Sequence, residues 1–204
     1  MKPLAKAALA ALVLPLALGG CISVFPKSKP AQLYRFANEP LQAGTNLPAA
    51  SARVVARGNV RFETAAAGDR ILTVTGPDTA YVAGARWVSP APVLFEEALV
   101  RAFEAAGGPR LAEGGSAIRA TQVLNLDVQT FETRYDQGDK AAPEVVVQVR
   151  AQLIRTSDRG VIADQLFTSA QRAGDNRVGP IVSAYDAAVR EVLGKLASWA
   201  AGQG

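Results

Sequence analysis

The stretch "EVVVQVRAQLI", residues 144–154, decides the fold of the second half of this 204-residue chain. Apolar residues occupy every second position, and polar residues such as Arg150 lie between them. Side chains that alternate in this way point to opposite faces of a β-sheet, so the stretch predicts a strand with one buried and one solvent-exposed face. The predicted buried set is Val145, Val147, Val149, Ala151 and Leu153.

The same alternation occurs on both sides of this strand. Residues 118–130 show it before the strand, and after it the turn "TSDRG" at 156–160 leads into "VIADQLFTSAQR" at 161–172. Antiparallel strands can be joined by short turns, so the three runs predict an antiparallel meander. The buried positions of the first run are Ile118, Ala120, Leu124, Leu126 and Val128.

Two amphipathic helices are predicted, over about 90–106 and 180–200. For the first, Ser89 is the expected N-cap, Pro90 suits the first turn, and Gly107 marks the end. Glu96 and Glu97 come early in this helix, where the macrodipole favours acidic side chains. Its apolar face is Phe95, Leu99, Ala102, Phe103 and Ala106.

The second helix opens at Gly179 and Pro180. Its outer face is expected to carry two ion pairs at i,i+4 spacing, Asp186 with Arg190 and Glu191 with Lys195. Its predicted buried face is Val182, Tyr185, Val189, Val192, Leu193, Leu196 and Trp199.

Earlier strands are expected at 31–36, 51–63 and 70–76, with a loop rich in Pro, Gly and Asn over 38–50. An antiparallel sheet needs one face covered, and two amphipathic helices are suited to cover it. We therefore predict a single α+β domain over 31–204. Its antiparallel-dominated sheet would end in the three-strand meander, with both helices packed on it.

The composition excludes several classes of function. The chain has no histidine and one cysteine, so the commonest general base and metal ligand are missing and no intrachain disulfide can form. The net charge is +4, and without Lys2 and Lys6 of the leader it is +2, with basic residues scattered among acidic ones. We expect no metal, no cofactor and no nucleic acid partner.

Residues 1–20 are predicted to be a secretory signal peptide. Lys2 and Lys6 form a positive n-region, and the apolar run from Leu9 to Leu18 is too short to span a membrane. The string Leu18-Gly19-Gly20-Cys21 resembles the bacterial lipobox. That resemblance implies cleavage between Gly20 and Cys21 and attachment of lipid, such as palmitate, to Cys21. The alternative is a chance cysteine at the end of an ordinary signal peptide.

Residues 21–30 then read as a lipidated cysteine followed by a Pro-containing tether. Several acyl chains on one residue hold a protein firmly on a membrane, whereas a single chain binds only marginally. Ile22 follows the cysteine where retention in the inner membrane would favour Asp, so the resemblance points to the outer membrane, with the domain facing the periplasm.

Four further segments resemble the ABC-type transport auxiliary lipoproteins, the group that includes the PqiC-like proteins. They are "YRF" at 34–36, "YVAGARWVSPAPVLFEEALVRAFEAAG" at 81–107, "LNLDVQTFE" at 124–132 and "VSAYDAAVREVLGKLASW" at 182–199. The family usually has a Trp, then an acidic residue, then Pro; here Ser89 stands in the acidic position, which puts any role of that charge in doubt.

The resemblance implies a part in lipid transport between two membranes. Such systems pair an ABC ATPase and permease with a periplasmic Mce-domain protein, and the auxiliary lipoprotein serves the outer-membrane end. It also implies self-association into a homo-oligomer. The ATPase must be another chain, because this one has no Gly-x-x-x-x-Gly-Lys-Ser/Thr loop.

Arg86 and Trp87 are the first candidates for partner binding, since these residue types concentrate binding energy at interfaces. Tyr81 and Tyr185 are further candidates. The alternative for each aromatic residue is packing in the core, and for Trp87 we favour that alternative.

No catalytic residues are predicted. Asp127, Glu132 and Asp136 lie near the end of one predicted strand, but their spacing suits a solvated face better than a pair of acid and base groups. No serine lies in a Gly-x-Ser-x-Gly frame. Two functions remain open: a docking subunit of a transport system, or a periplasmic carrier or envelope-assembly lipoprotein that holds phospholipid in an apolar cavity.

Overall fold

The computed structural model describes residues 30–37, 53–113 and 120–203. The predicted signal peptide, Cys21, the predicted loop at 38–50, and Ile118 lie outside the described residues. The contacts divide the chain into two units, Met1–Pro30 and Ala31–Gly204, and only the second is described below.

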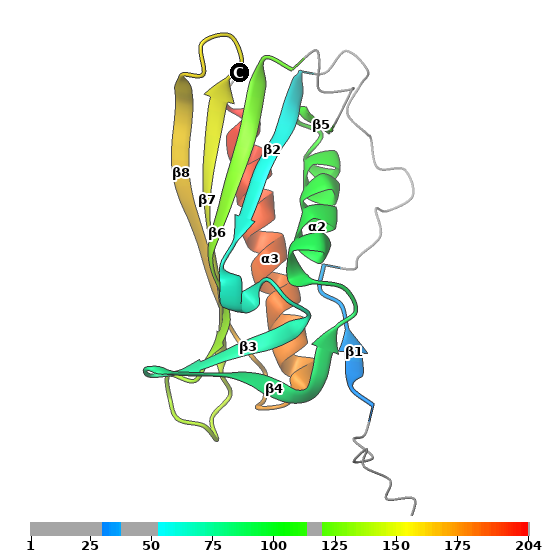
Figure 1. Ribbon diagram of the computed structural model, residues 1–204, viewed down its shortest axis with the longest axis vertical. Coiled ribbons are helices and arrows are strands. Elements are labelled where there is room, and N and C mark those ends of the chain that lie inside the picture. Colours follow the sequence, from blue (N-terminus) through cyan, green and yellow to red (C-terminus); the bar gives the residue numbers. More distant parts are fainter. Residues whose placement is uncertain (1–29, 38–52, 114–119, 204) are drawn as a thin grey trace, which may run out of the picture. The chain divides into compact units, whose positions relative to one another are not determined.

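The second unit consists of strands and two long helices in the following order (Figure 1). The elements are β1 (Gln32–Tyr34), β2 (Val54–Phe62), the 3-10 helix η2 (Thr64–Ala66), β3 (Arg70–Thr75), β4 (Asp78–Trp87), α2 (Ala91–Ala106), β5 (Arg110–Ala112), β6 (Gln122–Arg134), β7 (Glu144–Arg155), β8 (Val161–Arg172) and α3 (Val178–Ala201).

The strands form one 8-stranded sheet, and it is mixed. The predicted meander is confirmed: β6 pairs with β7 and β7 with β8, both antiparallel. The pair β3–β4 is also antiparallel, whereas β1–β4, β2–β5, β2–β6 and β3–β6 are parallel. Antiparallel pairing joins more residues than parallel pairing, as predicted, but the prediction did not include the parallel pairs. The parallel pairs join strands that are distant in sequence, and alternation within one strand does not reveal the direction of its partner.

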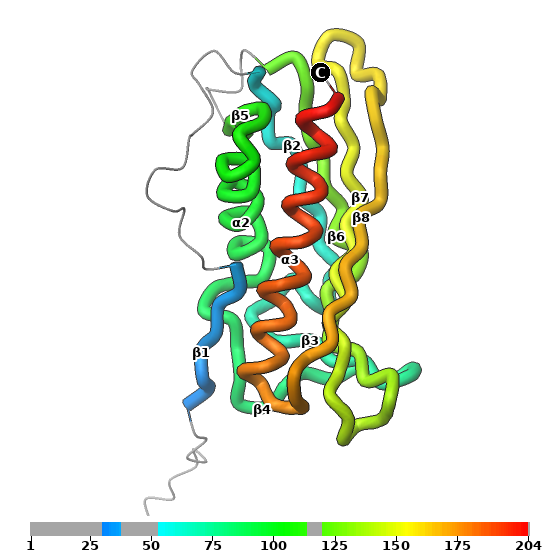
Figure 2. Tube along the Cα trace, turned by 180° about the vertical axis from the view of Figure 1, so that it is seen from behind, coloured from blue at the N-terminus to red at the C-terminus, as the bar shows by residue number. Residues whose placement is uncertain are grey.

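Both helices lie on the same face of the sheet, so the unit has two layers (Figures 1 and 2). The predicted buried positions of β7 are confirmed, since their side chains are fully enclosed between sheet and helices. Phe95, Leu99 and Phe103 of α2 are buried in the same core, whereas Ala106 is exposed. No described helix covers the opposite face of the sheet, which is called the open face below (Figure 1).

The N-terminus of α2 differs from the prediction. Pro90 is the N-cap, and no side chain caps the helix, so Ser89 does not have the expected role. The first turn contains no acidic residue. Glu96 and Glu97 lie in the second turn and form ion pairs with Arg57 and Arg35, respectively. Gly107, with φ 61°, ends the helix as predicted.

The second helix, α3, extends two residues before the predicted start and one beyond the predicted end. Both predicted i,i+4 ion pairs are present. At its C-terminus, Arg53 Nη2 donates to the carbonyl of Ala200 over 2.6 Å, which ties the start of β2 to the end of the helix. A cation at this place is favoured by the helix dipole.

A β-bulge keeps the core face of β6 continuous. Val128 pairs with Val149 and Thr130 with Gln148, so Gln129 is an extra residue on β6. Its insertion moves the buried positions from even to odd numbers, and Phe131 is consequently buried. The sequence pattern gave no sign of this shift.

Two strands were absent from the sequence prediction. The first is β4, which forms a hairpin with β3, and the second is the short β5. Residues 78–86 of β4 are mostly exposed or half-buried, so this strand lacks the apolar alternation on which the prediction relied.

Candidate functional site

Two of the four candidate partner-binding residues lie in the core. Trp87 is 2% exposed and Tyr185 is fully buried, and their rings meet edge to face with centroids 5.1 Å apart. Phe36 packs against Trp87 at 5.0 Å and Phe131 against Tyr185 at 4.8 Å. Direct contact between a partner and these two side chains does not fit such burial, whereas the packing alternative does.

The other two candidates reach the surface. Arg86 projects from β4, and its guanidinium donates to both carboxylate oxygens of Asp69 over 2.9 Å. Tyr81 is half-buried, donates its hydroxyl to the carbonyl of Ala65 over 3.0 Å, and has the guanidinium carbon of Arg70 3.7 Å above its ring. The structure therefore separates the four candidates into two core residues and two surface residues.

The three carboxylates considered for catalysis do not converge. Asp127 pairs with Arg61, Glu132 with Arg134, and Asp136 with Arg172. The hydrogen bond from Arg172 lowers the pKa of Asp136, which keeps it ionised. Each carboxylate is thus neutralised by a different arginine, as on a solvated charged face. Among the described residues, no cluster of His, Cys, Asp or Glu can hold a metal ion.

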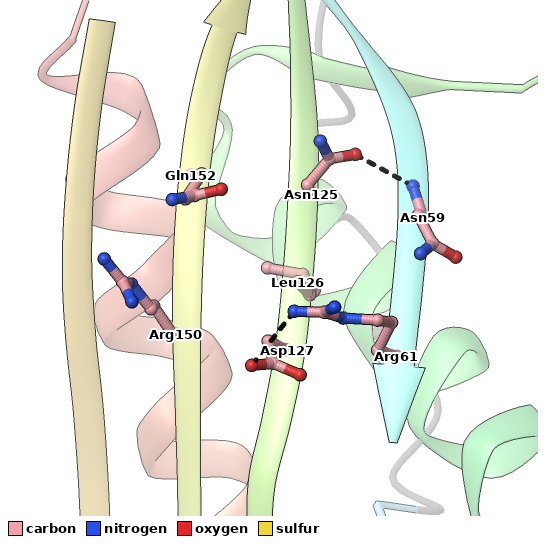
Figure 3. Close-up of a pocket in the computed structure, with 7 residues that line it drawn as sticks. All are labelled: Asn59, Arg61, Asn125, Leu126, Asp127, Arg150 and Gln152. Atoms are coloured by element: carbon pink, nitrogen blue, oxygen red, sulfur yellow. Dashed lines mark hydrogen bonds and ion pairs between the residues drawn. The ribbon is translucent and has the colours of Figure 1, made fainter. Parts of the chain in front are cut away.

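A polar surface lies on the open face of the sheet, across β2, β6 and β7 (Figure 3). Here a shallow cavity of about 310 Å³ is open to solvent. Its lining residues are Asn59, Arg61, Asn125, Leu126, Asp127, Arg150 and Gln152.

A second bulge shapes one side of this cavity. Gly58 and Asn59 of β2 together face the single residue Asn125 of β6, since Arg57 pairs with Leu124 and Val60 with Leu126. The side-chain oxygen of Asn125 accepts the backbone N–H of Asn59 over 2.9 Å, and this bond closes the bulge (Figure 3). At Gly58, a Cβ atom would overlap the side chains of Asn125 and Val123, so the close approach of the strands requires glycine.

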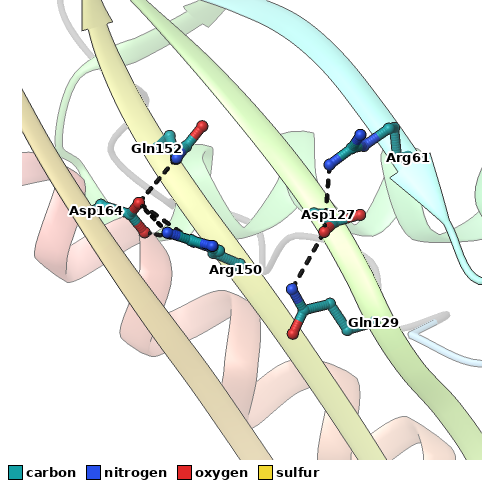
Figure 4. Close-up of polar contacts among 6 residues, drawn as sticks. All are labelled: Arg61, Asp127, Gln129, Arg150, Gln152 and Asp164. Atoms are coloured by element: carbon teal, nitrogen blue, oxygen red, sulfur yellow. Dashed lines mark hydrogen bonds and ion pairs between the residues drawn. The ribbon is translucent and has the colours of Figure 1, made fainter. Parts of the chain in front are cut away.

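Two chains of polar contacts cross the open face (Figure 4). In the first, Asp127 lies 3.4 Å from the guanidinium of Arg61 and accepts from Gln129 over 3.1 Å. In the second, Asp164 of β8 accepts from Arg150 over 2.7 Å and from Gln152 over 2.8 Å.

These contacts fix the charge state of the second chain. The hydrogen bonds from Arg150 and then Gln152 lower the pKa of Asp164 to about 2. Asp164 therefore remains ionised and paired at neutral and mildly acidic pH. The charges of the two arginines and the two aspartates cancel. The resulting surface is neutral overall and presents amide, carboxylate and guanidinium groups. Such a surface can form hydrogen bonds with a polar partner, but it provides no nucleophile with an adjacent base.

The alternation of apolar and polar residues in the sequence predicted part of this site. It placed Asn125, Asp127, Arg150 and Gln152 on the exposed faces of their strands. The alternation did not indicate Asn59, Arg61 or Asp164. These residues belong to other strands, β2 and β8, which come to lie beside β6 and β7 only when the strands pair. The sequence feature that could have indicated these ion pairs was the presence of Arg and Asp at alternating exposed positions of neighbouring strands.

The described residues thus form a two-layer α+β unit with a polar surface on one face of its sheet. None of its described helices is long and apolar enough to cross a membrane. The family model described as "ABC-type transport auxiliary lipoprotein component" matches residues 34–197. The chain belongs to this family, whose members are auxiliary components of ABC-type transport. The family is not a known enzyme family.

Solved structures share the fold. A protein from Xanthomonas campestris, XCC0632, is 26% identical, with a TM-score of 0.70 over 85% of this chain and 97% of that one. An uncharacterised protein is 14% identical, with a TM-score of 0.63 over 84% and 99%. The PelC dodecamer from Paraburkholderia phytofirmans is less similar in structure, with 23% identity over 74% of this chain and 93% of that one and a TM-score of 0.40. A comparison with curated proteins found no match.

Proposed function

We propose that this protein is a non-catalytic docking subunit of an Mce-type lipid transport system, anchored by Cys21 in the outer membrane and facing the periplasm. The match of the family model over residues 34–197 carries the proposal, since it names an auxiliary lipoprotein of ABC-type transport. The lipobox-like string that ends at Cys21 supports the anchor.

The packing of the core favours docking over the alternative of a lipid carrier. A carrier needs an apolar cavity between sheet and helices. In this unit, rings of Phe36, Phe62, Trp87, Phe131 and Tyr185 contact one another there, with neighbouring centroids 4.8–5.3 Å apart. The described residues thus fill the space that an acyl chain would occupy.

The open face of the sheet supports the same function. Its paired charges and amides suit a polar protein surface and offer no apolar slot for a lipid tail. Arg86 of β4 is a further surface candidate for the partner. We propose the Mce-domain protein and the permease with its ATPase as partners, and a homo-oligomer as the assembled form.

Co-purification tests the proposal. The full-length lipoprotein would be produced together with the Mce-domain protein and permease of the same source, extracted from envelope membranes in mild detergent and captured by a tag. We expect both partners to be recovered with it. Recovery of a monomer carrying stoichiometric phospholipid, without either partner, would instead establish the carrier function.

A further inference from the structure

The strand β8 forms an open edge of the sheet. It pairs with β7 on one side, and no other described strand pairs with it (Figures 1 and 2). It is 12 residues long, whereas the other outer strands, β1 and β5, have 3 residues each. Among the described residues, β8 is thus the long free edge of this sheet.

The pairing with β7 shows which backbone groups face outward. Ala173 N–H donates to the carbonyl of Pro143 over 2.9 Å, in line with the register that pairs Gln171 with Val145 and Ser169 with Val147. Hydrogen-bonded and non-hydrogen-bonded pairs alternate along an antiparallel ladder, so the odd-numbered residues of β8 bond to β7. The even-numbered residues, which are Asp164, Leu166, Thr168, Ala170 and Arg172, direct their N–H and C=O groups to the free edge.

This edge lacks the features that usually block strand pairing. Natural edge strands carry Pro, free Lys or inward charges that prevent another strand from adding. β8 contains neither Pro nor Lys. Its charged residues are paired within this chain: Asp164 accepts from Arg150 of β7, and Arg172 donates to Asp136 of the turn after β6.

The side chains along the edge leave apolar surface exposed that an added strand could cover. On the open face, Leu166 is 50% exposed although it lies in the middle of β8. On the helix face, Phe167 packs against Trp199 of α3, with ring centroids 5.6 Å apart, and Trp199 is only partly buried. A strand beside β8 would cover apolar surface on both faces at this point.

We propose that β8 binds an extended, largely uncharged segment of another transport-system protein, which adds to this sheet as a further strand. The occupant is a strand because the free groups are backbone N–H and C=O in regular register. It is largely uncharged because both charged residues of β8 are already paired, Asp164 with Arg150 of β7 and Arg172 with Asp136 of the turn after β6. This inference rests on the proposed docking function and specifies where docking occurs.

A proline on the edge tests the backbone bonding. In Ala170→Pro the outward N–H is removed while the bonds of the odd-numbered residues to β7 remain, and Pro is tolerated in edge strands at such a position. Ala170→Val is the matched control, because it retains the N–H and suits a strand. Both variants would be made in the full-length lipoprotein and checked for an unchanged far-ultraviolet circular dichroism spectrum and melting temperature.

In the co-purification described above, we expect Ala170→Pro to reduce recovery of the partner by about tenfold or more, and Ala170→Val to leave it unchanged. A second variant, Thr168→Lys, places an edge-blocking charge beside the groups that bond and is expected to act like the proline. Wild-type recovery with both the proline and the lysine variant would overturn the inference.

Hydrogen exchange separates failure of this inference from failure of the proposed function. We expect the amides of the even-numbered residues from Asp164 to Arg172 to be protected in the wild-type complex and to exchange readily in the purified protein, because only these amides face the free edge. If no transport protein is recovered but these amides are protected in envelope membranes, the edge is occupied and the proposed function is wrong. Protection that rises with the concentration of the purified protein alone would show that a second copy fills the edge, which overturns the choice of partner.

Discussion

At the scale of single residues, burial separates the candidates that sequence alone grouped together. Trp87 and Tyr185 are large aromatic residues near predicted element ends, and either could have been a binding anchor. Their mutual edge-to-face contact, with Phe36 and Phe131 on either side, makes them the centre of the core. Mutations at these positions should therefore change stability first.

Replacing Trp87 by Ala should lower the free energy of unfolding by about 3–5 kcal/mol, because it removes a buried ring and leaves a cavity. Urea unfolding followed by circular dichroism measures the loss. Arg86→Ala is the neighbouring surface control, with an expected change below about 1 kcal/mol. A Trp87 variant of wild-type stability that no longer recovers the transport partners would instead favour a binding role.

Tyr185 should make the protein sensitive to alkaline pH. Burial raises the pKa of its hydroxyl well above the ordinary value, so the folded state retains the proton after the unfolded chain has lost it. Above about pH 10 the folded state therefore binds more protons, and this tyrosine reduces stability by up to ~1.4 kcal/mol per pH unit.

Urea unfolding of wild type and Tyr185→Phe between pH 8 and about pH 11 checks this prediction. The decline should be shallower in the variant. Some decline remains, because burial also raises the pKa of Tyr135. At neutral pH the variant should lose about 1 kcal/mol, since Thr133 no longer donates its 3.3 Å hydrogen bond to the Tyr185 hydroxyl. Parallel curves for the two proteins would contradict the assignment.

At the scale of elements, bulges align the strands. The bulge at Gln129 keeps apolar residues of β6 on the helix side, and the bulge at Gly58 and Asn59 sets the distance between β2 and β6 beside the polar cavity. Both depend on a partner strand, so neither is visible in the hydropathy of one segment. The exposed edge of β8 likewise depends on which strands pair, so it is not visible in the hydropathy of β8 alone.

Gly58→Ala should destabilise the protein by about 1–3 kcal/mol through overpacking between β2 and β6. The added Cβ would lie 2.6 Å from Val123 Cγ1 and 3.0 Å from the carbonyl oxygen of Leu124. Gly174→Ala is the matched control, because nothing lies within 4 Å of its Cβ position, and it should change stability by less than about 0.5 kcal/mol. Thermal unfolding of both variants measures the difference; equal melting temperatures would mean that the strands shift at no cost.

At the scale of the whole molecule, the proposed function depends on an anchor and a surface in separate parts of the chain. Cys21 would hold the protein on the membrane, and the open face and β8 edge of the second unit would meet the partner. Either part can be removed by mutation without altering the other.

Cys21→Ala should release the protein from membranes, because no acyl chain can then be attached to this residue. Carbonate-washed envelope fractions and mass spectrometry of the processed N-terminus provide the measurement, with unchanged circular dichroism as proof that the domain still folds. A Cys21→Ala protein that stays with the membrane and is processed normally would defeat the lipoprotein assignment.

The sequence alone determined the meander β6–β7–β8, the two helices and which side of β7 is buried, because those properties follow from the local period of the backbone. Tertiary structure decided the rest. The parallel pairing of β2 and β3 with β6, the two bulges, the burial of Trp87 and the pairing of Asp164 with Arg150 each depend on segments that meet only after the chain has folded. Periodicity indicates which face of an element is apolar, but it contains no information on the neighbour against which that face or edge will pack.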